Sequence, residues 1–231
     1  RDMTRSLGLG DVYKRQEPTI KRSRSHDYVS REVINVRENV GLIEVANFSK
    51  HEFKGTDARK FLDHVMAGKL PKPGRISLSP MLSYRGKLCG DLTVACFDEN
   101  EFMVFGSGAA QEMHRRWFES HLDKFDVNYK NRSDEFHGIS IAGPNSRKVL
   151  EKIVRDDVSN EKFKFRDSRR MFVGGVPAII NRISFTGELG YEIYVAPHYQ
   201  IKLYEELMEA GKEFNIKPVS YTHLRAHETW S

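Results

Sequence analysis

Two well-separated segments with the pattern of β-strands carry carboxylates in an otherwise apolar setting. Residues 78–95 contain Asp91, and residues 182–196 contain Glu188. An ionised carboxylate is costly to bury unless a partner compensates its charge. A strand that keeps one therefore has a structural or functional reason, and both segments are candidates for a site.

Both ends of the chain are excluded from the fold prediction. Residues 11–16 and 219–223 can be encoded by opposite strands of one DNA adapter, of the kind used to prepare transposon-based sequencing libraries. Segments of that origin carry no information about a fold. We interpret residues 1–16 as a non-native leader, residues 17–217 as the natural insert and residues 218–231 as a non-native tail. The insert has the length of one large domain or two small ones.

The composition is that of a globular chain and gives no reason to expect a nucleic-acid or membrane partner. The net charge is +5, of which the leader supplies +2 through four basic and two acidic residues, so the insert has +3. That charge is too small to indicate nucleic-acid binding by itself, and the basic run at residues 21–24 is interpreted as a solvated segment. No apolar stretch approaches the roughly 20 residues that span a bilayer.

The cysteines and histidines do not predict a metal site. Cys89 and Cys96 are the only cysteines, and they lie seven residues apart in one predicted strand, so they are expected on opposite faces. No disulfide framework follows. We therefore expect a reducing compartment, either the bacterial cytoplasm or the mitochondrial matrix. His114, His121 and His137 lack the spacing of metal ligands and are expected to be packing or surface residues.

The order of predicted elements indicates an α+β fold. Apolar spacing predicts helices over residues 28–39, 58–66, 109–124, 144–153 and 200–210. Alternating or apolar runs predict strands over residues 41–47, 49–55, 76–82, 88–97, 102–105, 136–142, 176–185 and 190–196. Hairpins are mixed with helices, and strict alternation of strand and helix is missing, so a parallel doubly wound sheet is not expected.

The two carboxylates have ordinary interpretations as well as functional ones. Asp91 follows Gly90, and a glycine inside a strand often marks the close approach of a ligand or of another backbone. Asp91 could equally be a turn residue or an ion-pair partner, and Glu188 a carboxylate in a hairpin turn. Residues 106–108 lack the third glycine of a dinucleotide-binding loop, and no serine has a histidine and an acid placed to suggest a catalytic triad.

Four segments, in this order, are similar to the folate-binding aminomethyltransferase (glycine-cleavage T-protein) family. Each segment alone is unspecific, whereas their order and spacing together are specific. The segments are GLIEVANFSKHEFKGTDA at 41–58, LSPMLSYRGKLCGDLTV at 78–94, ISIAGPNSRKVL at 139–150 and RISFTGELGYEIYV at 182–195.

The resemblance implies roles for individual residues. When the second segment is aligned on Leu82 and Gly86, Asp91 falls on the catalytic aspartate of the family, and Glu188 falls on its pterin-contacting glutamate. The implied fold is the aminomethyltransferase-type folate-binding fold, truncated at the C-terminal side. The implied cofactor is tetrahydrofolate, with an amine as the other small-molecule partner. The other implied folate-binding residues are Phe105, Met81 and Arg182.

Departures from the stand-alone transferase favour one branch of this family. Leu78 stands where that enzyme has tyrosine, and Ser83 where it has asparagine. Residues 79–82 and 116–119 look more like the folate domain fused behind flavin-dependent dimethylglycine or sarcosine dehydrogenases. That branch implies an FAD domain in cis, before this segment, which oxidises an N-methyl amine. We expect this segment alone to be inactive.

Two other interpretations stay open. One is a stand-alone glycine-cleavage aminomethyltransferase. The other is a non-catalytic folate-binding protein of iron–sulfur cluster maintenance, although the Lys-Gly-Cys signature of those proteins is missing from the sequence. The function implied most directly is tetrahydrofolate-dependent transfer of a methylene unit, with Asp91 orienting or deprotonating the folate nitrogen and Glu188 accepting hydrogen bonds from the pterin.

Overall fold

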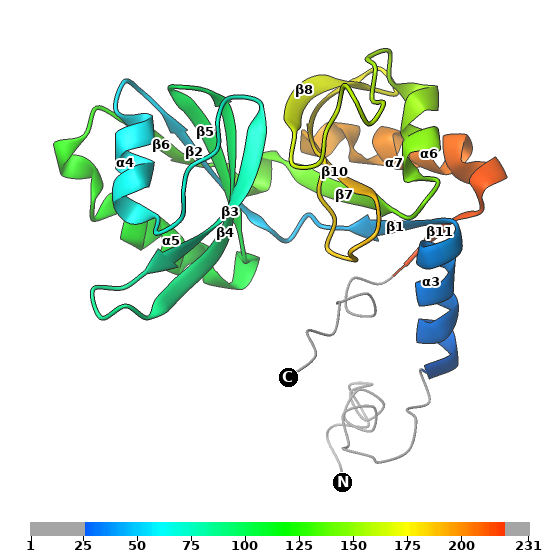
Figure 1. Ribbon diagram of the computed structural model, residues 1–231, viewed down its shortest axis with the longest axis horizontal. Coiled ribbons are helices and arrows are strands. Elements are labelled where there is room, and N and C mark those ends of the chain that lie inside the picture. The colour runs from blue at the N-terminus through cyan, green and yellow to red at the C-terminus, as the bar shows by residue number, and fades with distance from the viewer. Residues whose placement is uncertain (1–25, 220–231) are drawn as a thin grey trace, which may run out of the picture.

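A computed structural model describes residues 26–219 and has two lobes, each built on one β-sheet (Figure 1). The predicted leader, the basic run at 21–24 and residues 220–231 of the predicted tail lie outside the described residues. The predicted boundary before residue 218 falls inside a strand, because Pro218 pairs with Leu42.

Lobe A carries a sheet whose described strands have the order β11-β1-β7-β10-β9-β8. Strands β1 and β11 pair in parallel, and the other described neighbours are antiparallel. We call it sheet A. Its strands are β1 (Val40–Glu44), β7 (His137–Ala142), β8 (Ser168–Val173), β9 (Val176–Asn181), β10 (Gly190–Val195) and β11 (Ile216–Pro218).

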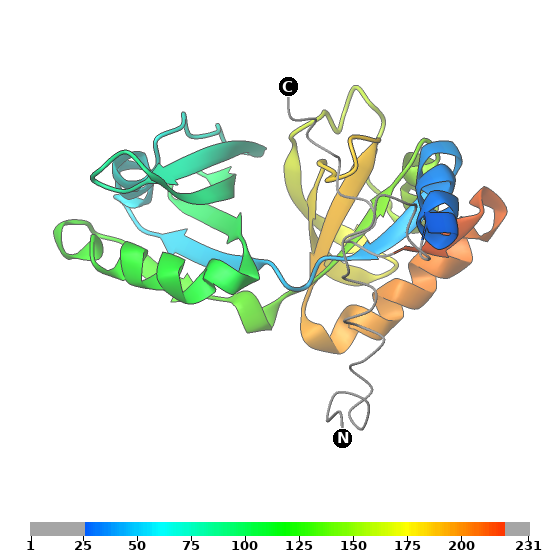
Figure 2. The same cartoon turned by 90° about the horizontal axis from the view of Figure 1, so that it is seen from below.

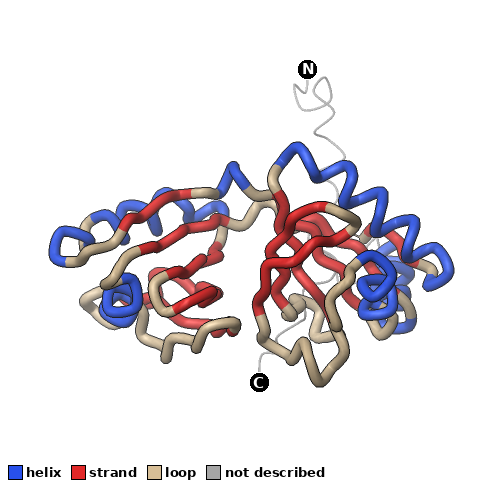
Figure 3. The backbone as a smooth tube through the Cα atoms, turned by 90° about the horizontal axis from the view of Figure 1, so that it is seen from above, coloured by secondary structure: helices blue, strands red, loops and turns tan. Residues whose placement is uncertain are grey.

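Lobe B is inserted between β1 and β7 and carries an antiparallel sheet with the described order β3-β4-β5-β2-β6. We call it sheet B. Its strands are β2 (Ser49–Lys54), β3 (Arg75–Leu82), β4 (Leu88–Asp98), β5 (Glu101–Gly106) and β6 (Asn128–Asn131). The chain crosses between the lobes twice, at residues 45–48 and 132–136 (Figure 3).

Helices cover one face of each sheet. In lobe A, α6 (Ser146–Ile153) and α7 (Gln200–Gly211) supply side chains to a core with β7, β9 and β10. In lobe B, α4 (Ala58–Val65) and α5 (Gln111–Glu119) pack on the face formed by residues such as Leu92 and Val94. Figure 2 shows α5 and α7 along the same side of the molecule, one under each lobe. Helix α3 (His26–Glu38) packs beside β1 and β11.

The faces of the two sheets that the helices leave open contribute to a third core, which we call the interlobe cluster. It combines apolar side chains of sheet B with apolar side chains of sheet A and its neighbours. Burial of this apolar surface favours one arrangement of the lobes. The cluster contains Val36, Ile43, Val45, Ile76, Ala95, Met103, Phe105, Ala142, Ile179, Tyr194 and Val219.

The predicted α+β class is confirmed, with local differences. The helix predicted over 109–124 is divided into a 3-10 turn (Gly108–Ala110), α5 and a second 3-10 turn (Leu122–Lys124). Helix α5 ends at Glu119, and Ser120 follows it, with its hydroxyl donating to the Trp117 carbonyl at 2.8 Å. Three further 3-10 turns span Ser133–Glu135, Pro197–Tyr199 and Lys212–Phe214.

Two predictions about individual strands were wrong. The strand predicted over 176–185 ends at Asn181. The cysteines do not lie on opposite faces, because both contact the core of lobe B. Cys89 lies at a β-bulge, where the pairing shifts from Met81 with Gly90 to Leu82 with Leu88, and the extra residue breaks the alternation of side chains. Both thiols are free.

No described helix is both long enough and apolar enough to cross a membrane.

Candidate functional site

Asp91 lies on the face of sheet B that is turned toward lobe A. Side chains alternate along a regular strand, so Asp91 shares a face with Thr93 and with Ala95, which belongs to the interlobe cluster. The Asp91 side chain is exposed and forms no hydrogen bond or ion pair with any described residue. Its carboxylate is therefore available to a ligand, and its position depends on the backbone that carries it.

His114 fixes that backbone from the opposite face. Its ring is buried on the inner side of α5, and Nε2 lies 3.3 Å from the carbonyl oxygen of Cys89, to which a protonated Nε2 donates. A Cβ added at Gly90 would lie 2.8 Å from this Nε2, and one added at Gly106 would lie 3.1 Å from Nδ1. Burial lowers the pKa of His114. The two glycines thus let a neutral imidazole pack directly on the strand that presents Asp91.

Phe105 joins the two lobes. It pairs with Thr93 on β4 and with Lys50 on β2, so the three residues form one row across sheet B. Its ring stacks on that of Tyr194 from lobe A, with 4.6 Å between the ring centroids and 30° between the planes. Such an offset stack is favourable beyond the area it buries. The predicted site residue Phe105 therefore lies where the sheets meet, on the same face of sheet B as Asp91.

The structure reveals a second carboxylate on the facing surface of lobe A. Glu192 lies on β10 two residues before Tyr194, and the Tyr194 hydroxyl donates to Glu192 Oε2 at 2.8 Å. Burial raises the pKa of Glu192 to about 7, and the hydrogen bond from Tyr194 offsets part of that rise. A carboxyl with such a pKa exchanges its proton near neutral pH.

A polar atom without a partner lies next to Glu192. Asn181 is its direct neighbour on β9, and Asn181 Oδ1 accepts a hydrogen bond from Ser168 at 2.7 Å. The other half of the amide, Nδ2, is buried and has no hydrogen-bond partner among the described residues. Buried polar groups are nearly always paired, so this donor is a further sign that the surface around Glu192 is built for polar contacts.

Glu188 lies in the turn between β9 and β10 and is partly exposed. The Ser184 hydroxyl donates to the Glu188 carbonyl oxygen at 2.5 Å, and the Glu188 amide donates to Thr186 Oγ1 at 3.3 Å. These contacts fix the backbone of the turn. The Glu188 carboxylate itself has no hydrogen-bond partner among the described residues.

The structure does not bring the other two predicted folate-binding residues to the interlobe surface. Met81 is fully buried in the helix-covered core of lobe B. Arg182 is also buried, and its guanidinium donates to the Phe163 carbonyl at 2.5 Å and to Asn160 Oδ1 at 2.7 Å. In these positions Met81 packs a core and Arg182 ties a loop to lobe A.

Lys50 holds the two chain crossings together. Its side chain is fully buried, and Nζ donates to the carbonyl oxygens of Ala46 at 2.6 Å and Ser133 at 3.4 Å, one on each crossing. Nζ also lies 5.9 Å from the centroid of the Tyr194 ring. Burial lowers the pKa of Lys50 to about 8, although Glu44 and Asp134 oppose the shift.

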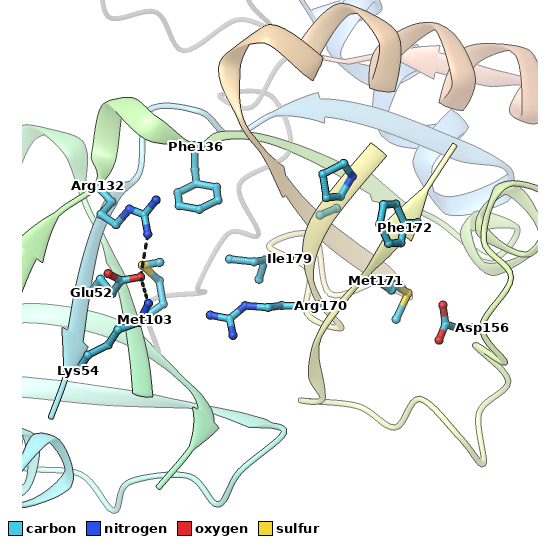
Figure 4. A pocket seen from close by; sticks show the side chains of 12 residues that line it. Glu52, Lys54, Met103, Arg132, Phe136, Asp156, Arg170, Met171, Phe172 and Ile179 are labelled. Atoms are coloured by element: carbon cyan, nitrogen blue, oxygen red, sulfur yellow. Dashed lines mark hydrogen bonds and ion pairs between the residues drawn. The ribbon is translucent and has the colours of Figure 1, made fainter. Parts of the chain in front are cut away.

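A cavity of about 460 Å³ lies between the lobes (Figure 4). None of the predicted site residues lines it. Asp156 lines it without an ion pair to any described residue, whereas its other charged groups form ion pairs: Arg132 and Lys54 with Glu52, and Arg170 with Glu101. Because those charges are satisfied within the protein, the cavity is a weaker candidate than the surface that carries Asp91 and Glu192. No group of side chains in the described part of the chain could hold a metal ion.

Comparison with known proteins identifies the family. The family model described as the GCVT N-terminal domain matches residues 7–228. The chain belongs to the GCVT N-terminal domain family. It is 36% identical over 202 residues to mitochondrial dimethylglycine dehydrogenase of Mus musculus, covering 86% of this chain and 23% of that protein. It is 30% identical over 186 residues to an aminomethyltransferase of Thermoanaerobacter pseudethanolicus, covering 79% of this chain and 50% of that protein.

A solved structure confirms the predicted fold. Glycine cleavage system aminomethyltransferase T from Bartonella henselae matches with a TM-score of 0.73 at 21% identity, over 83% of this chain and 50% of that one. The chain thus spans half the length of the aminomethyltransferases it matches and less than a quarter of the dehydrogenase. The relationship to both enzyme groups agrees with the resemblance seen in the sequence motifs.

The sequence contained a signal for Glu192. It is a charged residue between Tyr191 and Ile193, in a strand that is otherwise apolar. This is the same pattern that made Asp91 a candidate. The Thr-Gly-Glu motif favoured Glu188, four residues earlier. A carboxylate in a turn is less costly to keep ionised than one inside a strand, which needs a partner when it is buried.

Proposed function

We propose that this chain is the folate-binding part of a protein that transfers a methylene unit from an N-methyl or aminomethyl amine to tetrahydrofolate. We further propose that the parent protein is like dimethylglycine or sarcosine dehydrogenase, with an FAD domain in cis. The observation that carries the proposal is the interlobe surface, where an unpaired carboxylate, Asp91, and a half-buried carboxyl with a raised pKa, Glu192, come from the two facing sheets. The 36% identity to dimethylglycine dehydrogenase supports the choice of parent.

The residues present fit a folate. A pterin has adjacent amino and ring N–H donors next to a carbonyl acceptor. The Glu192 carboxylate would accept from the donors, and the unpartnered Nδ2 of Asn181 is a donor on the neighbouring strand. Glu188, at the mouth of the β9–β10 turn, would be a second acceptor. Bound tetrahydrofolate would supply the nucleophilic nitrogen that receives the one-carbon unit.

Asp91 would act on the reacting atoms. Its carboxylate would orient the folate nitrogen, take up the proton that this nitrogen releases, and stabilise a cationic iminium carbon nearby. Fixed charges facing a site from which water is excluded interact more strongly than they do in water. His114, through the backbone of residues 89–91, would keep Asp91 in place.

Binding can be tested on this chain by anaerobic calorimetric titration with tetrahydrofolate. We expect Glu192→Gln to weaken binding by about 1–3 kcal/mol, the contribution of a hydrogen bond to a charged group. Glu188→Gln should have a smaller effect, because that side chain is partly exposed. Tyr191→Phe, on the opposite face of β10, is the matched control. Equal affinity of the wild type and both glutamine variants would contradict the proposed folate contacts.

Catalysis has to be tested in the full-length protein that carries this chain. We expect Asp91→Asn to lower the rate of methylene transfer by roughly 100-fold or more, as for loss of a positioned acid–base group. Folding should be unaffected, because the Asp91 side chain has no partner among the described residues. An unchanged transfer rate would remove Asp91 from the mechanism.

A stand-alone aminomethyltransferase is the second candidate, supported by the 30% identity to the Thermoanaerobacter enzyme. Purification of the parent protein distinguishes the two. A yellow flavoprotein that consumes dimethylglycine or sarcosine supports the first, and a flavin-free protein that needs an aminomethyl donor supports the second. The corresponding compartments would be the mitochondrial matrix or the bacterial cytoplasm.

A further inference from the structure

Tyr194 occupies a position that its neighbours determine almost completely. The ring is fully buried, lies over Gly138 of β7, and leaves so little room there that an added Cβ would approach its Cε1 to 2.7 Å. The Phe105 ring stacks on it at 4.6 Å, and Lys50 Nζ lies 5.9 Å from its centroid. Phe105 and Lys50 both belong to sheet B, whereas Tyr194 belongs to sheet A.

The hydroxyl of this ring is the hydrogen-bond donor to Glu192 Oε2, at 2.8 Å. Glu192 and Tyr194 are two residues apart on one face of β10, so the bond is short and local. Packed side chains keep one rotamer because any other rotamer would clash with close-packed neighbours. A shift of Phe105 or Lys50 relative to lobe A would therefore move the Tyr194 ring and, with it, the carboxyl of Glu192.

We propose that Tyr194 is an interlobe positioning residue. The position of its ring depends on the position of lobe B, and its hydroxyl orients the Glu192 carboxyl accordingly. The link to ligand binding rests on the proposed folate-binding function. The positioning itself does not, because it is a property of the unliganded protein. This inference distinguishes Tyr194 from Tyr191 on the same strand, whose hydroxyl accepts from Arg147 Nε at 3.1 Å on the helix-covered face.

The pKa of Glu192 is a direct measure of its hydrogen bond from the Tyr194 hydroxyl, given the charges in its surroundings. Its direct neighbours on β7 and β9 are Ser140 and Asn181, which carry no charge. On its own strand the titratable neighbour is Tyr194. From sheet B, Lys50 lies against the Tyr194 ring, and Asp91 and Glu52 share the sheet face that is turned toward lobe A. Burial raises the pKa of Glu192 to about 7, and the Tyr194 hydroxyl lowers it.

The test is an NMR titration of the Glu192 side-chain carboxyl carbon in the wild type and three variants of the chain. Tyr194→Phe keeps the stacked ring and removes the donor, so the pKa of Glu192 should rise by about one unit or more. Phe105→Leu keeps the hydroxyl and loosens the ring from lobe B, so the pKa should rise by a smaller amount. Tyr191→Phe, the matched control, should leave the Glu192 titration unchanged.

An unchanged Glu192 titration in Tyr194→Phe overturns the proposal. A shift in Tyr194→Phe with none in Phe105→Leu overturns the part that involves lobe B, because the hydroxyl would then act without help from that lobe. Equal shifts in Tyr194→Phe and Tyr191→Phe would point to general loosening of the strand and would also overturn it.

Binding of tetrahydrofolate by the same proteins separates this inference from the proposed function. If only the ionised carboxyl binds, a rise of the Glu192 pKa from about 7 to about 8 weakens apparent affinity about fivefold at pH 7 and hardly at all at pH 9. A shifted Glu192 titration combined with equal folate affinity at both pH values would support the positioning and contradict the folate contact.

Discussion

His51 makes the stability of this protein sensitive to acid. It lies on β2, fully buried beneath α5, with its Nδ1 atom 2.8 Å from the Tyr129 hydroxyl and its ring edge-on to Phe118 at 5.2 Å. Burial, with a smaller contribution from the nearby His114, lowers the pKa of His51 from 6.5 to about 4. The folded protein therefore keeps this imidazole neutral in a pH range where an unfolded chain protonates it.

The sign and size of the effect follow from proton linkage. Below pH 6.5 the unfolded chain binds a proton that the folded protein does not bind until about pH 4, so the free energy of unfolding falls as the pH drops through this window. For these two pKa values the loss between pH 7 and pH 5 is about 2 kcal/mol. That is a large part of the total stability of a typical domain.

The assay is urea unfolding of the wild type and His51→Phe at pH 7 and pH 5. The variant lacks the imidazole, so its free energy of unfolding should fall by about 2 kcal/mol less than that of the wild type over this range. Tyr129→Phe is the control, because it removes the same hydrogen bond but keeps the histidine. It should lower stability at both pH values and retain the wild-type pH dependence. An equal fall in the free energy of unfolding for the wild type and His51→Phe between pH 7 and pH 5 would show that His51 is not the source of the pH dependence.

Two further predictions use the same measurements. The pKa of Lys50 is about 8 in the folded protein and 10.5 in the unfolded chain, so the free energy of unfolding should rise by about 2 kcal/mol from pH 8 to pH 10. Lys50→Met should lack that rise. If the variant keeps the rise, another group is responsible. Gly90→Ala should destabilise the protein by about 1–3 kcal/mol, because the new methyl group overlaps the His114 ring. The double variant Gly90→Ala/His114→Ala should regain part of the lost stability, measured as a higher melting temperature than that of Gly90→Ala alone. An equal melting temperature would show that the His114 ring does not cause the steric clash.

The sequence predicted those elements whose physical cause is local. Helix α7 and strand β7 have strong apolar patterns, and they were found within one or two residues of their predicted ends. Strands β6 and β8 were missed because they are rich in polar and charged residues, and both are held by pairing with β2 and β9, which a local pattern does not reveal. The helix around Trp117 was predicted too long because its apolar spacing continues past Ser120 into the 3-10 turn at Leu122–Lys124.

The candidate site could be predicted only in part, since it is formed by contacts between distant segments. Asp91 was singled out from its strand and from the family resemblance, and its exposure follows from its position near the end of the β3–β4 hairpin. The stack of Phe105 on Tyr194, which in turn donates a hydrogen bond to Glu192, depends on how the lobes pack. The burial of Met81 depends on the register of β3, and that of Arg182 depends on the loop around Asn160.

Binding of a reduced folate between facing carboxylates of the two lobes can be tested directly on the chain. The most direct measurement is an amide NMR titration of the chain with tetrahydrofolate under anaerobic conditions. We expect the amide signals of Asp91 and Phe105 in lobe B to shift together with those of Glu192 and Tyr194 in lobe A, along one binding curve, while the signals of α6 and α7 stay unchanged. Shifts confined to one lobe or to the cavity lined by Arg132 and Arg170 would contradict this binding site, as would the absence of shifts at saturating ligand.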